Sequence, residues 1–219
     1  MDEKEVQQIL IEILYAAVNE VENNESFKEK ITPERLLAVY SLAKKHDLAH
    51  VVSNFAYRNQ IEADEEFQLR LRREERLSVY RNEQMKYAFE EICGAFEDAG
   101  IVYIPLKGSV IRPYYPYESM RTSCDIDILI HEQDLEVAIA KLEEKGYQCG
   151  EQNHHEVSLY SPNKIHLELH FNIQENRKNL DVVLKDAWEY VVPINGCQYA
   201  FTKEFFAFHI FAHMAYHFV

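Results

Sequence analysis

Residues 125–130 read DIDILI, two aspartates that alternate with large aliphatic side chains. A short apolar run of this kind predicts a buried strand. Since successive side chains of a strand point to opposite faces, Asp125 and Asp127 share one face. Their like charges repel each other and aspartate is a poor strand former, so a divalent cation between them is one reason for such a pair to persist. The alternative is a strand end with two solvated acids.

Upstream, the apolar stretch IVYIPL at 101–106 predicts a second buried strand, which runs directly into Lys107-Gly108-Ser109. Gly108 has no Cβ, so the backbone there can approach a ligand closely. A short helix starting at Ser109 would direct free N–H groups and the positive end of its dipole at a phosphate. Many strands end in a Gly-Ser turn for structural reasons alone, and this motif by itself leaves both interpretations open.

Downstream, residues 165–171 alternate between apolar and polar side chains, which predicts a strand whose polar face carries His166, Glu168 and His170. If this strand lies beside DIDILI, three carboxylates gather opposite the Gly-Ser turn. Such a set can hold two Mg²⁺ or Mn²⁺ ions, one orienting a triphosphate and the other activating an acceptor hydroxyl. The two histidines either support the metal ligands from outside or only line a polar strand face.

Taken in order, LKGS, RTSCDIDILI and HLELHF resemble the motifs of the DNA-polymerase-β-like nucleotidyltransferase superfamily. More closely, the chain is similar to a bacterial branch of nucleotidyltransferases, from about Tyr103 to its C-terminus. Glu168 departs from the aspartate that many relatives carry, and its longer arm could loosen the metal geometry. The matching positions are Leu106-Lys107-Gly108, Tyr115-Pro116, Arg121, Asp125-Ile126-Asp127, Glu168-Leu169-His170 and the helical pair His213 and His217.

The resemblance implies roles for individual residues. Asp125, Asp127 and Glu168 would be the catalytic metal ligands, and Glu168 would also help to deprotonate the acceptor. Gly108 and Ser109 would hold the nucleotide phosphates. Two cations, Lys107 and Arg121, would either contact phosphate or pair with nearby acids.

The implied reaction moves a nucleoside monophosphate from an NTP, with ATP as the first candidate, to a hydroxyl-type acceptor on a small molecule or a protein. The alternative is a non-catalytic module of the same fold that senses nucleotide or binds a partner protein. Retention of all three acids favours catalysis.

Three histidines, His209, His213 and His217, recur at four-residue steps and share one face of a predicted helix. Two histidines at that spacing can bind zinc, but no third zinc ligand is evident. We expect these three histidines to form a polar stripe that faces the substrate cleft. His170, His213 and His217 would be accessory residues of the site.

Around these motifs the sequence predicts an α+β fold, in which an N-terminal helical region (1–99) packs on a nucleotidyltransferase-type α/β core (100–201) with a small mixed sheet. Thr32-Pro33 is a helix start, and the Arg- and Glu-rich pattern at 64–99 is typical of a solvated helix face. Residues 202–219 begin a C-terminal helical region that we expect to continue beyond this sequence. Further expected elements are a helix at 132–145, a strand at 156–160 and a hairpin turn at Asn195-Gly196.

Composition narrows the functional classes. The formal net charge of −14 disfavours nucleic acid as a partner, because an acidic surface repels a phosphate backbone. The four cysteines form no CxxC pair, and the N-terminus lacks the pattern of a signal peptide. No apolar stretch approaches the roughly 20 residues of a membrane span. We expect a cytoplasmic protein that does not bind a membrane.

Overall fold

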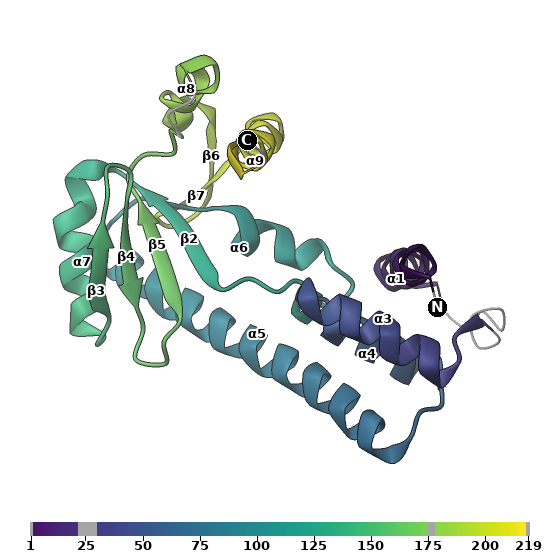
Figure 1. Ribbon diagram of the computed structural model, residues 1–219. Coiled ribbons are helices and arrows are strands. Elements are labelled where there is room, and N and C mark those ends of the chain that lie inside the picture. The colour runs from purple at the N-terminus through teal and green to yellow at the C-terminus, as the bar shows by residue number, and fades with distance from the viewer. Residues whose placement is uncertain (1, 22–29, 175–177, 218–219) are drawn as a thin grey trace. The chain divides into compact units, whose positions relative to one another are not determined.

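The structure is a computed structural model that describes residues 2–21, 30–174 and 178–217 (Figure 1). The chain forms two compact units that interleave along the sequence. Unit 1 comprises Met1–Glu83 and Arg112–Thr122, and unit 2 comprises Gln84–Ile111 and Ser123–Val219. The long helix α5 (Glu65–Ala99) contributes its first part to unit 1 and the remainder to unit 2. No helix in the described ranges is both long and apolar enough to cross a membrane.

Unit 1 is helical, as predicted for this region. Its main helices are α1 (Glu3–Val18), α3 (Pro33–Lys45), α4 (Ala49–Arg58) and the first part of α5. Thr32 caps α3, since its hydroxyl accepts a hydrogen bond from the backbone N–H of Arg35 at 3.4 Å. The apolar faces of these helices share one core, which includes Ile13, Leu36, Val39, Val52, Phe55 and Phe67.

The segment 112–122 belongs to the same unit and contains two short 3₁₀ turns, η1 (Arg112–Tyr114) and η2 (Glu118–Met120). The buried ring of His50 lies with Nε2 2.9 Å from the carbonyl oxygen of Met120. The guanidinium of Arg58 stacks over the ring of Tyr117, 4.5 Å from its centroid. These contacts fasten the segment to α4.

Among the described residues, seven strands of unit 2 form one sheet in the order β3-β4-β5-β2-β1-β7-β6. The β2–β5 and β1–β7 pairs are parallel and the others antiparallel, so the sheet is mixed, as predicted. In chain order the strands are β1 (Tyr103–Pro105), β2 (Asp125–Ile130), β3 (Gln148–Gln152), β4 (Glu156–Tyr160), β5 (His166–His170), β6 (Val191–Asn195) and β7 (Gln198–Phe201).

Two apolar cores lie on opposite faces of this sheet, because alternate side chains of each strand enter one or the other. The first core joins Ile126 and Ile128 of β2 to the end of α5 and to α7 (Leu135–Glu144), which follows the short turn η3 (Glu132–Asp134). The second core contains Leu129 of β2, side chains of the neighbouring strands β1 and β7, and side chains from three helical elements. These are α8 (Lys178–Leu184), η4 (Ala187–Tyr190) and α9 (Lys203–His217). The predicted α+β fold class is confirmed.

Some elements carry no signal that periodicity could detect. Strand β3 reads QCGEQ and is exposed along its whole length, and β6 contains Pro193. The predicted turn at Asn195-Gly196 does join β6 to β7, and Gly196 adopts a left-handed φ of 53°. The carboxylate of Glu97 accepts the backbone N–H of Cys197 at 2.9 Å and ties this turn to α5.

Candidate functional site

Strand alternation places the charged residues of unit 2 on one side of the sheet. Ile126 and Ile128 of β2 and Leu167 and Leu169 of β5 enter the first core, which leaves the intervening polar side chains on the opposite face. We call this the carboxylate face. It consists of Asp125 and Asp127 on β2, His166, Glu168 and His170 on β5, and Glu156 and Ser158 on β4.

The parallel register of β2 and β5 brings the predicted acids together. Asp127 is paired with Glu168, and Asp125 is paired with His166. One ligand atom each from Asp127, Glu168 and His170 lie within 4.8 Å of one another, close enough to hold a single metal ion. Asp125 faces the same side of β2 but stands outside this group of three.

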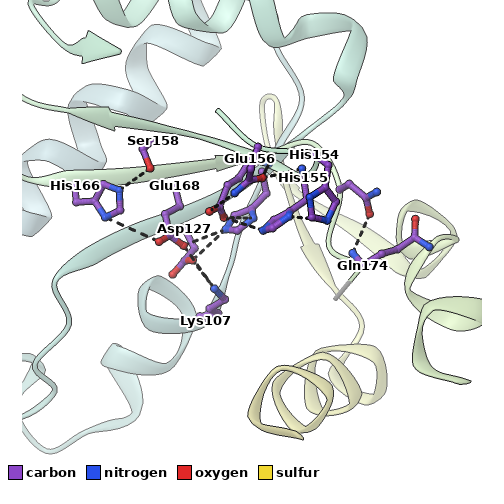
Figure 2. Close-up of polar contacts among 12 residues, drawn as sticks. Lys107, Asp127, His154, His155, Glu156, Ser158, His166, Glu168 and Gln174 are labelled. Atoms are coloured by element: carbon purple, nitrogen blue, oxygen red, sulfur yellow. Dashed lines mark hydrogen bonds and ion pairs between the residues drawn. The ribbon is translucent and has the colours of Figure 1, made fainter. Parts of the chain in front are cut away.

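Lys107 supplies the positive charge among these acids. Its Nζ lies 2.7 Å from Oδ1 of Asp127 and 3.8 Å from Oε2 of Glu168 (Figure 2). The backbone N–H of Leu106 donates to the carbonyl of Asp127 at 2.9 Å, so β1 delivers the next residue beside the carboxylate. The left-handed φ of 40° in this turn falls on Lys107 rather than on Gly108. Such a backbone conformation costs roughly 1–2 kcal/mol at a non-glycine residue and is characteristic of functional sites.

His170 is held by carboxylates at both ring nitrogens. Its Nε2 lies 3.2 Å from Oδ1 of Asp127 and 3.5 Å from Oε2 of Glu168, and its Nδ1 lies 3.2 Å from Oε2 of Glu156. Glu156 reaches this position because β4 runs antiparallel to β5 and pairs with it at His170. Sequence reasoning did not identify Glu156. Its position follows from the register of the β4–β5 hairpin across the turn at 161–165, which the pattern of a single strand does not contain.

The neighbouring histidine is oriented in a similar way. His166 Nε2 lies 3.0 Å from the hydroxyl oxygen of Ser158, and its Nδ1 lies 4.0 Å from Oε1 of Glu168. Figure 2 shows His166, Glu168 and Asp127 converging on one region above Lys107. The polar side chains therefore fix one another in a network rather than pointing separately into solvent.

The pKa values follow from this crowding. Burial by itself would raise the pKa of Asp127, but the hydrogen bond with His170 and the charge of Lys107 hold it far below its usual range. Burial disfavours the charged forms of His170 and Lys107, yet the surrounding acids raise the pKa of both. The pKa of Asp125 is raised by burial and by the charges of Asp127 and Glu168. A cation beside Asp125 would favour the ionised form of this carboxyl group.

The residues predicted to hold phosphates fall in two places. Gly108 and Ser109 lie in the five-residue helix α6 (Lys107–Ile111), which begins two residues before the predicted start. The backbone N–H of Ser109 donates to the carbonyl of Leu106 at 3.1 Å. Arg121 belongs to unit 1, where its Nε is buried and has no hydrogen-bond partner among the described residues. Its role with a nucleotide stays a prediction.

Helix α9 carries the histidine series. His209 is buried, and its Nδ1 has no hydrogen-bond partner within the described part of the chain. Burial, with the charges of Lys107, His213 and His170, lowers the pKa of His209 to about 4. The rings of His209 and His213 are 6.5 Å apart, while the side chain of His217 lies outside the described residues. In the described ranges, the group of three possible metal ligands includes neither His209 nor His213.

Comparison with known proteins adds a family match. Residues 32–219 match a protein family described as "Uncharacterised nucleotidyltransferase". No curated protein matches the chain. The chain is similar to the solution structure of the antibiotic-resistance factor ANT(2'')-Ia, with 15% sequence identity and a TM-score of 0.37. That similarity covers 42% of this chain and 48% of the other, about half of its length.

Proposed function

The chain belongs to this family of nucleotidyltransferases, and we propose that it is an enzyme of the nucleotidyl-transfer class with the carboxylate face as its catalytic centre. The observation that carries the proposal is the register of β2 and β5, which pairs Asp127 with Glu168 on the polar side of the sheet. In the proposed reaction the acceptor oxygen bonds to the α-phosphorus of the NTP. The bond to the pyrophosphate breaks, and the acceptor hydroxyl loses its proton.

The donor set fits a hard divalent cation. Carboxylate oxygens of Asp127 and Glu168 are the ligands that Mg²⁺ and Mn²⁺ prefer, and both groups lie within the cluster that could hold one ion. Asp125 adds a third carboxylate on the same side of β2. We assign His170 to a supporting position, since imidazole is a softer ligand than these ions favour. When bound, the metal would offset the triphosphate charge and acidify the acceptor hydroxyl.

Lys107 has two successive roles in this proposal. Before substrate binds, its ammonium group neutralises Asp127 and Glu168, as the distances of 2.7 and 3.8 Å indicate. With that charge offset by a bound divalent cation, Lys107 would be free to contact a phosphate of the nucleotide. Gly108 and Ser109, which belong to the same unit as Lys107, complete the proposed phosphate contacts.

Glu156 and His170 act as positioning residues. Since His170 contacts Asp127 and Glu168 through one nitrogen and Glu156 through the other, its ring orientation is fixed from both sides. That arrangement holds the two metal-binding carboxylates at a constant separation. We assign to Glu168, which is less buried than Asp127, the role of accepting the acceptor's proton.

The remaining features of the proposal rest on the sequence. The resemblance of the LKGS, DID and ELH motifs to a bacterial branch favours ATP as donor and a hydroxyl acceptor on a small molecule or a protein. The acidic composition favours an acceptor other than nucleic acid. We also propose that the reaction takes place in the cytoplasm.

The test is transfer of label from α-labelled NTPs to candidate acceptors in the presence of Mg²⁺. Asp127→Asn keeps the shape of the side chain and removes its charge, so we expect transfer to be lost while the fold survives. Asp98→Asn, an exposed aspartate of α5, is the matched control and should retain activity. Transfer by Asp127→Asn near the parent level would refute the assignment.

A second measurement does not require the acceptor. Three acids on one face repel a triphosphate until a divalent cation intervenes. Calorimetry should therefore show that Mg²⁺ strengthens NTP binding at the carboxylate face in the parent, and that Asp127→Asn loses most of this gain. An equal Mg²⁺ effect in both proteins would contradict a metal-dependent site at Asp127.

A further inference from the structure

Unit 1 contains a cavity of about 730 Å³ that shares no residue with the carboxylate face. Its walls come from α3, α4, the first part of α5 and the end of the 112–122 segment. We call it the arginine cavity, after Arg70, Arg73 and Arg81, which line it together with Lys44. The volume lies within the range typical of sites for small molecules.

The charge of these walls is opposite to that of the whole chain. Four cations line the cavity, against two acids, Asp47 and Glu74. The chain as a whole carries a formal net charge of −14. A local excess of positive charge within such an acidic protein indicates a site for an anion.

The acids of unit 1 do not neutralise all of these cations. Glu74 is shared between Lys44, whose Nζ lies 3.3 Å away, and the hydroxyl of Tyr40 at 2.9 Å. Arg70 pairs with Glu66. Arg73 has no hydrogen bond or ion pair with any described residue, and Arg81 acts on Glu74 only through its charge. Two guanidinium groups therefore remain available to a ligand.

The spacing of the arginines on α5 also destabilises this helix. Arg70 and Arg73 are three residues apart on α5, as are Arg73 and Arg76, and like charges at that spacing repel each other. Arg73 and Leu77 also line a smaller hollow of about 370 Å³, together with Arg72 and Arg76. A bound polyanion would relieve this repulsion, and the forked guanidinium group suits phosphate better than the ammonium of lysine does.

We propose that the arginine cavity binds a small molecule that carries two or more phosphate charges. Arg73 and Arg81 bind the phosphates, and Lys44 stays in its ion pair with Glu74. The volume suits a ligand of nucleotide size better than a single inorganic phosphate. Since the lining residues all belong to unit 1, the proposal does not depend on the catalytic role of Asp127.

The test is calorimetric titration of the full chain with pyrophosphate, ATP and inorganic phosphate in buffer with EDTA. Without divalent metal the carboxylate face repels anions, so binding reports on unit 1. We expect pyrophosphate and ATP to bind more tightly than phosphate, and binding to weaken as salt is raised. Arg73→Ala should weaken the association at least about tenfold, the scale of one charge-assisted contact to phosphate.

The matched control is Arg72→Ala, which removes the same charge from the same helix but does not line the cavity. Its affinity should stay within about twofold of the parent. Both arginines are exposed, so both variants should fold, and a melting curve checks this. No binding of pyrophosphate or ATP by the parent at millimolar concentration would overturn the proposal. Equal weakening by Arg72→Ala and Arg73→Ala would also overturn it, and would indicate a diffuse surface that attracts polyanions, including oligonucleotides.

Discussion

The carboxylate face of unit 2 and the arginine cavity of unit 1 both concentrate charge, but they do so on different scaffolds. Strand alternation buries Asp127 and His170 at 2% and 6% exposure, so the charges of these two side chains must have partners inside the protein. Helix α5 instead carries Arg73 and Arg81 on an exposed surface, where water can solvate a charge that has no partner within the protein. The buried cluster should thus be sensitive to the loss of any member, and the exposed one should be sensitive only in its affinity for a ligand.

The largest effect expected from this contrast is at Lys107. Lys107→Met removes the cation and leaves Asp127 and Glu168 without their main countercharge. Breaking a buried ion pair on one side costs about 3 kcal/mol or more of unfolding free energy. Chemical denaturation in EDTA measures this loss. Added Mg²⁺ should recover part of it in the variant, and a stability within about 0.5 kcal/mol of the parent would remove the argument for an essential countercharge.

The next effect concerns acid stability through His209. Because the folded pKa of about 4 lies below the ordinary value, the unfolded chain binds a proton first as the pH falls. The contribution of His209 to the free energy of unfolding is therefore fully present above about pH 6.5 and is lost as the pH falls towards 4. It amounts to roughly 3 kcal/mol for a shift of this size.

Melting curves from pH 7.5 to 4.5 test this for the parent and for His209→Gln, which cannot be protonated in that range. The variant should lose less stability than the parent as the pH falls. His46→Gln, at an exposed histidine of unit 1, is the control and should follow the parent. Parallel curves for parent and His209→Gln would show that the buried histidine does not set the acid limit.

A smaller effect is expected at Glu156. Glu156→Gln keeps a hydrogen-bond acceptor for His170 but removes the charge, so we expect a loss of about 1–2 kcal/mol in stability. Nucleotidyl transfer should fall about 10-fold or more, as for other partners that orient a metal-site histidine. Glu151→Gln, on the exposed strand β3, is the control. Unchanged Mg²⁺ dependence and rate in Glu156→Gln would exclude a positioning role.

The smallest effect is expected in the arginine cavity. Arg73 is exposed and has no partner among the described residues, so Arg73→Ala should change the stability of the metal-free, ligand-free protein by no more than about 0.5 kcal/mol. Denaturation of the two proteins side by side measures the difference. A loss as large as that at Lys107 would abolish the distinction between the two clusters.

Periodicity alone predicted the residues of the carboxylate face that lie on β2 and β5. The alternation of DIDILI and IHLELHF places Asp127 and Glu168 on polar strand faces, and the register of β2 and β5 then pairs them. The contribution of β4 could not be predicted, because the partner of His170 depends on the hairpin register, which a single strand pattern does not contain. The direction of Lys107 depends on a left-handed backbone angle that is unusual for lysine, and sequence reasoning left its pairing open.

The parts of the fold that were not predicted have a related explanation. Strand β3 has no apolar alternation, since both of its faces are exposed, and it forms because β4 offers it hydrogen bonds. The grouping of Arg112–Thr122 with unit 1 depends on contacts between distant parts of the chain, such as that of His50 with Met120. Local patterns carry no information about such pairs.

The position of β1 in the sheet has a consequence for synthesis on the ribosome. One neighbour, β2, follows it closely in the chain, but the other, β7, begins only at Gln198. At about 5–20 residues per second, β1 waits roughly 5–20 s after its own synthesis for this second neighbour. During that interval one edge of β1, whose buried sequence is YIP, has no partner strand. The Glu97 carboxylate also lacks the N–H group of the β6–β7 turn that it later binds. Completion of the sheet therefore comes late relative to the synthesis of β1, and the nascent chain is most exposed to aggregation or to chaperones just before β6 and β7 emerge.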